Sequence, residues 1–236
     1  MKKINTLIIG LGKIGFGYVK DYMYFRSHAY SIINNKNFRL IGGIDKSKIS
    51  RYRFKEKFKV PTYKKISKNH FSDVDLIIIA SNTYTHYQLL KEVIKDLRPK
   101  IILCEKPFTH EYEKAQIIFK SLKKKKIRLF VNYNRQSLPA IKKLKSIILN
   151  DRNFFKGKIV YPRGVINSCS HFLQLLLYLF GNFEKLYNKD DKKFFKSKNF
   201  SDFNRSFSVK FKKAHINFEP SKKKSKGYLI KLHNKT

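Results

Sequence analysis

Residues 4–15 read INTLIIGLGKIG, a largely apolar run that leads straight into a turn with three glycines. The segment Ile4 to Ile9 is uncharged and rich in β-branched side chains, which predicts a buried strand. The glycines follow the spacing G-x-G-x-x-G, which lets a chain pass sharply from a strand into a helix. This stretch therefore predicts the opening unit of a doubly wound α/β sheet.

Each glycine of the turn has its own task in a dinucleotide-binding unit. Gly10 permits the tight turn, Gly12 lets the backbone approach a pyrophosphate, and Gly15 lets the helix pack on the strand. The helix start offers N–H groups to phosphate oxygens, so Lys13 and Ile14 are also candidate cofactor ligands. The alternative is a glycine-rich turn that binds nothing.

Asp45 ends the next predicted strand, Phe38 to Ile44. A carboxylate at this place accepts hydrogen bonds from a ribose diol, which favours NAD over NADP as the cofactor. Two features leave NADP open. Asp45 lies 30 residues beyond Gly15, longer than the usual spacing of about 20, and Lys46 and Lys48 could hold a 2′-phosphate.

Strands alternate with helices through the first half of the chain. Helices are predicted at 19–33, 50–58, 87–97 and 111–122. A loop begins at 60–61 and leads into a short extended piece. Further strands are predicted at 74–80, 101–104 and 127–131. This order is typical of a Rossmann-type parallel sheet covered on both faces. We therefore expect a dinucleotide-binding domain over residues 1–131.

Beyond residue 131 the pattern changes. It predicts helices at 138–149 and 170–180, a loop at 190–198, and strands at 207–211, 215–218 and 228–232. These elements predict a small, abbreviated α+β domain with an open sheet over residues 132–236. Short sheets leave exposed edges, so this domain is expected to pair with another subunit.

The composition excludes several classes of protein. The 236 residues are 42% hydrophobic, with 10 Gly and 2 Cys, which excludes wholesale disorder, collagen and a disulfide scaffold. No uncharged apolar run is long enough to span a bilayer, and the run behind Lys2 and Lys3 is too short for a signal peptide. We expect a cytoplasmic protein with Cys104 and Cys169 as free thiols, no membrane partner and no metal site.

The formal net charge is +37, which ordinarily suggests nucleic acid as a partner. The excess is spread about evenly over the two halves, and its densest runs are 123–126 and 222–224. This even spread favours a general enrichment in lysine over a specific nucleic-acid site. In either case the positive charge attracts anionic substrates. A basic nucleic-acid-associated protein is the alternative.

Five segments carry a resemblance to a known family: GLGKIG at 10–15, SNTYTH at 81–86, CEKP at 104–107, NYNR at 132–135 and NSCSHFLQLLLYLFG at 167–181. In this order they resemble the Gfo/Idh/MocA oxidoreductases, with a shortened C-terminal part. The resemblance implies an NAD(P)-dependent enzyme that moves a hydride between a nicotinamide and a hydroxyl or keto carbon of a sugar or nucleotide sugar, for example in surface-polysaccharide biosynthesis. It also implies that the second domain binds the substrate and forms a homo-oligomer through its sheet.

The resemblance assigns roles to residues at the ends of the predicted strands. It implies that Ser81, Asn82, His86 and Glu105 line the cofactor pocket and that Arg135 lies near the substrate. The alternative for His86 is a buried ring satisfied by the backbone. The alternative for Arg135 is a structural ion pair.

The expected catalytic residues are Lys106, His171 and Asn167. By the resemblance, Lys106 contacts the reacting hydroxyl or carbonyl, where it would stabilise negative charge, and His171 takes the hydroxyl proton. Residues 167 and 171 share one helix face if the helix begins early enough. Many family members have Asp at position 167; Asn167 can orient a ring but cannot stabilise an imidazolium by charge. The alternative is therefore a catalytically impaired dinucleotide-binding or assembly protein.

Overall fold

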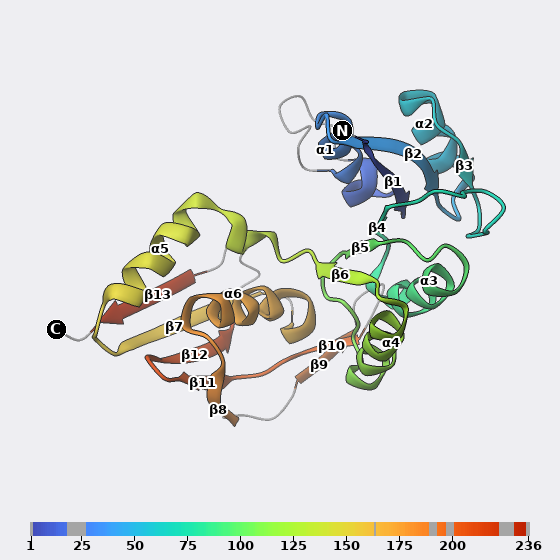
Figure 1. Cartoon of the computed structure of the whole chain (residues 1–236). Coiled ribbons are helices and arrows are strands. Elements are labelled where there is room, and N and C mark those ends of the chain that lie inside the picture. Colours follow the sequence, from blue (N-terminus) through green and yellow to red (C-terminus); the bar gives the residue numbers. More distant parts are fainter. Residues whose placement is uncertain are drawn as a thin grey trace. The chain divides into compact units, whose positions relative to one another are not determined.

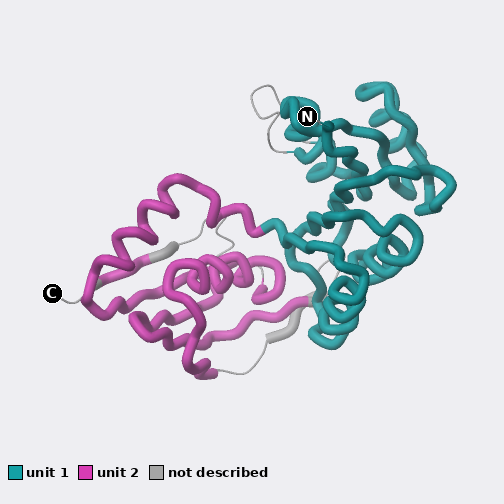
Figure 2. Tube along the Cα trace, viewed as in Figure 1, with its two compact units in different colours: residues 1–132 teal, residues 133–236 magenta. Residues whose placement is uncertain are grey.

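The computed structural model describes residues 2–17, 27–162, 164–188, 193–196, 201–221 and 229–234. The chain divides into two compact units, residues 1–132 and 133–236 (Figures 1 and 2). This division falls next to the boundary expected from the sequence. Each unit has its own sheet and its own core.

The first unit is built on a six-stranded parallel sheet in the order β3-β2-β1-β4-β5-β6. The strands are β1 (Ile4–Ile9), β2 (Phe38–Ile44), β3 (Thr62–Tyr63), β4 (Leu76–Ile79), β5 (Ile101–Cys104) and β6 (Arg128–Val131). The order reverses between β1 and β4, which is where doubly wound sheets bind ligands. The predicted Rossmann-type sheet is confirmed.

Helices cover both faces of this sheet, and each face has its own apolar cluster. The helical segments are the π-helical turn η1 (Lys13–Gly17), α1 (His28–Ile33), α2 (Lys48–Phe58), α3 (Thr83–Asp96) and α4 (Tyr112–Lys125). The predicted helix at 19–33 is seen from His28 onward, since residues 18–26 lie outside the described part. Helix α3 begins four residues earlier than the sequence predicts, because Asn82 caps it.

The second unit contains a five-stranded mixed sheet in the order β13-β7-β12-β11-β8. Its strands are β7 (Phe155–Tyr161), β8 (Phe183–Asn188), β11 (Phe207–Phe211), β12 (Ala214–Pro220) and β13 (Leu229–Asn234). Strand β12 pairs parallel to β7, and the other neighbouring pairs are antiparallel. The predicted small α+β domain with an open sheet is confirmed.

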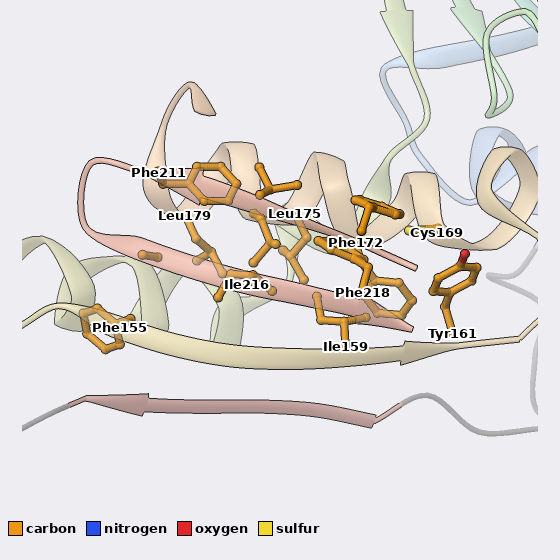
Figure 3. Packing of buried hydrophobic residues seen from close by; sticks show 14 of the residues in the cluster. Phe155, Ile159, Tyr161, Cys169, Phe172, Leu175, Leu179, Phe211, Ile216 and Phe218 are labelled. Carbon is orange, nitrogen blue, oxygen red and sulfur yellow. The ribbon is translucent and has the colours of Figure 1, made fainter. Parts of the chain in front are cut away.

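Helices α5 (Pro139–Asn150) and α6 (Ser170–Phe180) belong to this unit, together with the turns η3 (Asn134–Ser137) and η4 (Val165–Cys169). Figure 3 shows side chains of α6, among them Phe172, Leu175 and Leu179, packed on the sheet. Ile159 and Phe218, both fully buried, meet them from β7 and β12. This core fixes α6, the helix that carries His171.

The structure corrects one local prediction. Residues 193–196, expected within a loop, form strand β9 (Lys193–Lys196), which pairs antiparallel with β10 (Ser201–Asn204). The rest of the predicted loop at 190–198 lies outside the described residues. Within the described part, no helix combines the length and apolar character needed to cross a membrane.

Candidate dinucleotide-binding and active-site residues

The glycine turn lies between β1 and η1, at the carboxyl edge of the parallel sheet. Gly10 has a φ of +95°, and a side chain there would come within 2.5 Å of the Ser81 nitrogen. A Cβ at Gly15 would meet the Gly10 carbonyl oxygen. A Cβ at Gly12 would meet nothing within 4 Å. Gly10 and Gly15 thus have no room for a side chain, whereas the backbone at Gly12 faces open space. The approach of Gly12 to a pyrophosphate stays a prediction.

Asp45 follows β2 and lies directly against this turn. Its Oδ2 accepts a hydrogen bond from the Leu11 N–H at 2.7 Å, and its Oδ1 accepts one from the Ser47 N–H, also at 2.7 Å. Arg51 donates to the carbonyl of Asp45 at 2.8 Å, which fixes the loop after β2. Asp45 therefore lies beside the glycine turn, although 30 residues separate it from Gly15 in the sequence.

Ser81 and Asn82 follow β4, next to the glycine turn. The Ser81 hydroxyl accepts from Thr85 Oγ1 at 2.8 Å. Asn82 is the N-cap of α3 and accepts from the Tyr84 N–H at 3.4 Å. These residues hold the start of α3 at the same edge of the sheet as Gly10, which fits a role in lining a cofactor site.

His86 lies between α3 and the segment after β5. Its side chain is fully buried, its Nδ1 lies 3.1 Å from the Pro107 carbonyl oxygen, and its Nε2 lies 3.1 Å from the Ser81 carbonyl oxygen. Burial lowers the pKa of His86, opposed by these carbonyls. The ring ties α3 to the segment after β5, which is the buried, backbone-bonded environment that the sequence left open as the alternative. Contact of His86 with the cofactor stays a prediction.

Glu105 and Lys106 follow β5, where the sequence places them. Glu105 Oε1 lies 2.8 Å from His28 Nε2 and accepts from Asn132 Nδ2 at 2.6 Å. Burial raises the pKa of Glu105, but the hydrogen bonds from His28 and Asn132 outweigh it and hold the pKa below its ordinary value. The carboxylate is therefore ionised near neutral pH. Lys106 is half-buried and precedes Pro107.

In the second unit, Asn167 and His171 lie on consecutive helical turns. The turn η4 runs without a break into α6, so the early helix start that the shared face requires is present. Asp202 of β10, only 1% exposed, accepts from the N–H groups of Ile166 and Asn167 at 3.0 Å each. Gly164 leaves room for this carboxylate, because a Cβ there would meet Asp202 Oδ2.

Aromatic contacts orient the remaining candidates of this unit. The His171 ring packs edge-on against Tyr133, with centroids 5.9 Å apart. The Arg135 guanidinium lies 4.7 Å from the centroid of the buried Phe172 ring. Arg135 is thus held by a cation–π contact, and its substrate contact stays a prediction.

Three residues of these clusters have no role that could be predicted from the sequence: His28, Asn132 and Asp202. Asn132 stood inside the NYNR segment, but its partner Glu105 is 27 residues away. His28 and Glu105 are 77 residues apart in the sequence, so no local sequence pattern predicts that they pair.

The two cysteines are buried and free, as expected. Burial raises the pKa of both thiols, with nearby Glu105 adding to the effect at Cys104 and Asp202 at Cys169. Both side chains therefore stay protonated and inert as nucleophiles.

The first unit as a whole defines a dinucleotide-binding Rossmann domain. Its open backbone at Gly12 and the carboxylate of Asp45 beside it fit a diphosphate with an adjoining ribose. The Gfo/Idh/MocA family model, described as an oxidoreductase family with an NAD-binding Rossmann fold, matches residues 4–133. The chain belongs to this family, so the expected dinucleotide class of cofactor and the suspected family are both confirmed.

Two curated relatives come from Bacillus subtilis. The uncharacterized oxidoreductase YrbE is 30% identical over 149 residues, which cover 63% of this chain and 41% of YrbE. Glucose-6-phosphate 3-dehydrogenase is 27% identical over 151 residues, 64% of this chain and 39% of that enzyme. The chain thus spans about two fifths of the length of the curated relatives it matches.

Solved structures share the fold over nearly the whole chain. The WlbA dehydrogenase from Bordetella pertussis, in complex with NADH and UDP-GlcNAcA, superposes with a TM-score of 0.81 at 15% identity, over 99% of this chain and 76% of WlbA. The MviM dehydrogenase from Clostridium difficile gives 0.76 at 18% identity, over 99% and 75%. At these identities the likeness concerns the fold.

Proposed function

We propose that the chain is an NAD(P)-dependent oxidoreductase that transfers a hydride between the nicotinamide and a hydroxyl or keto carbon of a sugar or nucleotide sugar. The observation that carries the proposal is the arrangement at the carboxyl edge of the parallel sheet. The open turn at Gly12, the carboxylate of Asp45 and the Glu105-Lys106 pair all lie there. Such an edge is where doubly wound sheets bind dinucleotides.

Gly12, Lys13, Ile14 and Gly15 would hold the diphosphate through backbone N–H groups, which a helical first turn leaves for a ligand. Gly10, whose N–H donates to the Ile44 carbonyl at 2.8 Å, would contribute by shaping the turn. The Asp45 carboxylate would accept from the adenosine ribose. Its charge disfavours a 2′-phosphate, so NAD is the preferred cofactor.

Lys106, His171 and Asn167 would carry the chemistry on the substrate. The bound nicotinamide supplies a hydride acceptor or donor. In the oxidative direction the substrate loses a hydride from carbon and a proton from its hydroxyl, and a C=O bond forms. His171 takes the proton, Lys106 stabilises the developing negative charge on the oxygen, and Asn167 orients the imidazole.

Arg135 and the strong positive charge of the chain are suited to an anionic substrate. A phosphosugar or nucleotide sugar would be attracted to a surface of this charge. The substrate named for WlbA, UDP-GlcNAcA, is of this kind. The protein would act in the cytoplasm, where nicotinamide cofactors and nucleotide sugars are both found.

The direct test is turnover after cofactor binding is established. Thermal-shift titration should show stabilisation by NADH, and more weakly by NADPH, that grows with ligand concentration. A panel of phosphosugars and nucleotide sugars should then give a change in cofactor absorbance with at least one member. Tight NADH binding without turnover on any member would instead support the catalytically impaired alternative, which the Asn167 substitution favours.

Lys106→Ala should abolish turnover, with a loss of at least about 10²-fold in kcat, because the stabilising charge is gone. NADH affinity should stay close to that of the wild type. Lys120→Ala, on the exposed face of α4, is the matched control and should leave both unchanged. A Lys106→Ala protein with normal kcat would remove Lys106 from the mechanism.

A further inference from the structure

His28 and Glu105 form a largely desolvated pair at the carboxyl edge of the first sheet. The two side chains are 13% and 14% exposed, and Nε2 lies 2.8 Å from Oε1. Because the pKa of Glu105 is lowered and its carboxylate is ionised, the carboxylate only accepts hydrogen bonds. His28 Nε2 therefore carries the hydrogen of this contact.

Asn132 donates to the same carboxylate oxygen at 2.6 Å. The Asn132 N–H in turn donates to the Cys104 carbonyl at 2.8 Å, and the Glu105 N–H donates to the Ile79 carbonyl at 2.9 Å. The Glu105 side chain is thus clamped from α1 and from the end of β6, while its backbone is fixed to β4. Charge-assisted bonds of this kind are stronger and more directional than neutral ones.

The carboxylate keeps capacity for one more donor. Oε1 takes the contacts with His28 and Asn132, and the Lys106 backbone N–H also donates to the carboxylate. An ionised carboxylate offers about four lone-pair sites on its two oxygens, so it can still accept from a ligand. It is therefore a fixed acceptor beside the side chain of Lys106, the proposed catalytic lysine.

We infer that His28 is a positioning residue that holds Glu105 in the orientation in which its carboxylate accepts a hydrogen bond from the nicotinamide half of the dinucleotide. This inference rests on the proposed function. His28 itself does not touch the cofactor. It acts through Glu105, from the start of a helix that lies outside the glycine turn.

The inference predicts that His28→Leu weakens NADH binding about tenfold, since a charge-assisted hydrogen bond that fixes the acceptor is lost. His28→Gln should restore most of the affinity, because its amide nitrogen can donate to the same oxygen. NADH affinity is measured by fluorescence titration of the purified full chain, and thermal stability is measured on the same samples without cofactor.

The matched control is the pair of Lys100 and Asp75, whose Nζ and Oδ1 lie 2.8 Å apart. These residues directly precede β5 and β4, so the pair lies at the amino edge of the sheet, opposite the glycine turn. Lys100→Leu removes a charge-assisted contact there and should leave NADH affinity unchanged. Equal weakening by His28→Leu and Lys100→Leu would overturn the inference, since a general loss of stability would then explain both.

The outcomes also separate the inference from the proposed function. A wild-type chain that binds no NADH refutes the proposed function and the inference with it. A wild-type chain that binds NADH, with His28→Leu binding equally well, refutes only the inference. If His28→Leu is unfolded, the comparison of His28→Gln with the shorter His28→Asn decides. Tenfold weaker binding by His28→Asn than by His28→Gln supports the role, and equal affinity of the two contradicts it.

Discussion

At the scale of single residues, Asp45 sets the expected choice of cofactor. Its two carboxylate oxygens accept from the backbone at Leu11 and Ser47, so its charge is fixed beside the glycine turn. Asp45→Asn removes that charge and leaves Lys46 and Lys48 nearby. The ratio of NADPH to NADH affinity should therefore rise about tenfold.

Separate titrations with NADH and NADPH measure this ratio. Glu56→Gln, an exposed change on α2, is the control for removal of one negative charge and should leave the ratio as it is. An Asp45→Asn protein with the wild-type ratio would show that Asp45 does not contact the ribose.

Glu105 also gives the first unit a definite dependence on pH. Its pKa in the folded chain lies below the ordinary 4.5, so its contribution to stability is complete above that value and is lost as the pH falls through the folded-state pKa. Glu105→Gln should lower stability by about 1 kcal/mol at neutral pH, where the charge-assisted bonds are present. The difference should shrink below pH 4.5. Thermal unfolding of both proteins across this range is the measurement, and a difference that is constant with pH would contradict the ionised state.

At the scale of elements, two glycines of the turn between β1 and η1 have different roles: Gly10 is needed for folding, and Gly12 is expected to be needed for binding. The methyl group of Gly12→Ala meets open space, so the Tm should change by less than about 2 °C. NADH affinity should nevertheless fall at least about tenfold, because the methyl group blocks the diphosphate. Gly10→Ala must hold a φ of +95° against Ser81 and should lose more than about 2 kcal/mol of stability. Calorimetry and NADH titration distinguish the two. Unchanged NADH binding by Gly12→Ala would place the diphosphate elsewhere.

How much of each element could be predicted depended on its burial. Strands β1 and β4 are buried on both faces, β4 at every position, and such strands appear in the sequence as continuous apolar runs. Strand β7 was missed because Lys156 and Lys158 alternate with its buried residues and Gly157 interrupts it. Strand β8 exposes all six side chains, so it has no apolar pattern to read.

The residues of the candidate site likewise divide into those that local sequence predicts and those that it does not. The glycine turn and Asp45 could be placed from local spacing, because the strand–turn–helix geometry follows directly from the chain. The partners of Glu105 and of the η4 backbone could not, since His28 and Asp202 reach them across 77 and 35 residues. His86 was assigned to the pocket by resemblance, whereas its environment of carbonyls becomes visible only once the loop after β5 is folded.

At the scale of the whole molecule, the expected homo-oligomer has a specific edge available. Strand β8 ends the second sheet among the described strands, and it exposes Phe183 at 49%, Leu186 at 45% and Tyr187 at 36%. An edge strand with exposed apolar side chains is a template for pairing. The net charge of +37 opposes that pairing, because two copies repel each other at low ionic strength.

Association should therefore strengthen as salt rises from about 0.05 to about 0.5 M, where the Debye length shortens from beyond 10 Å to a few ångströms. Leu186→Glu should weaken association at both salt concentrations by placing a charge on the β8 edge, whereas Ile117→Glu, at an equally exposed position on α4, should not. Sedimentation velocity over a range of protein concentrations measures both effects. Because the two variants carry the same change in net charge, a difference between them locates the contact at β8, and a monomer under all conditions would rule out the expected pairing.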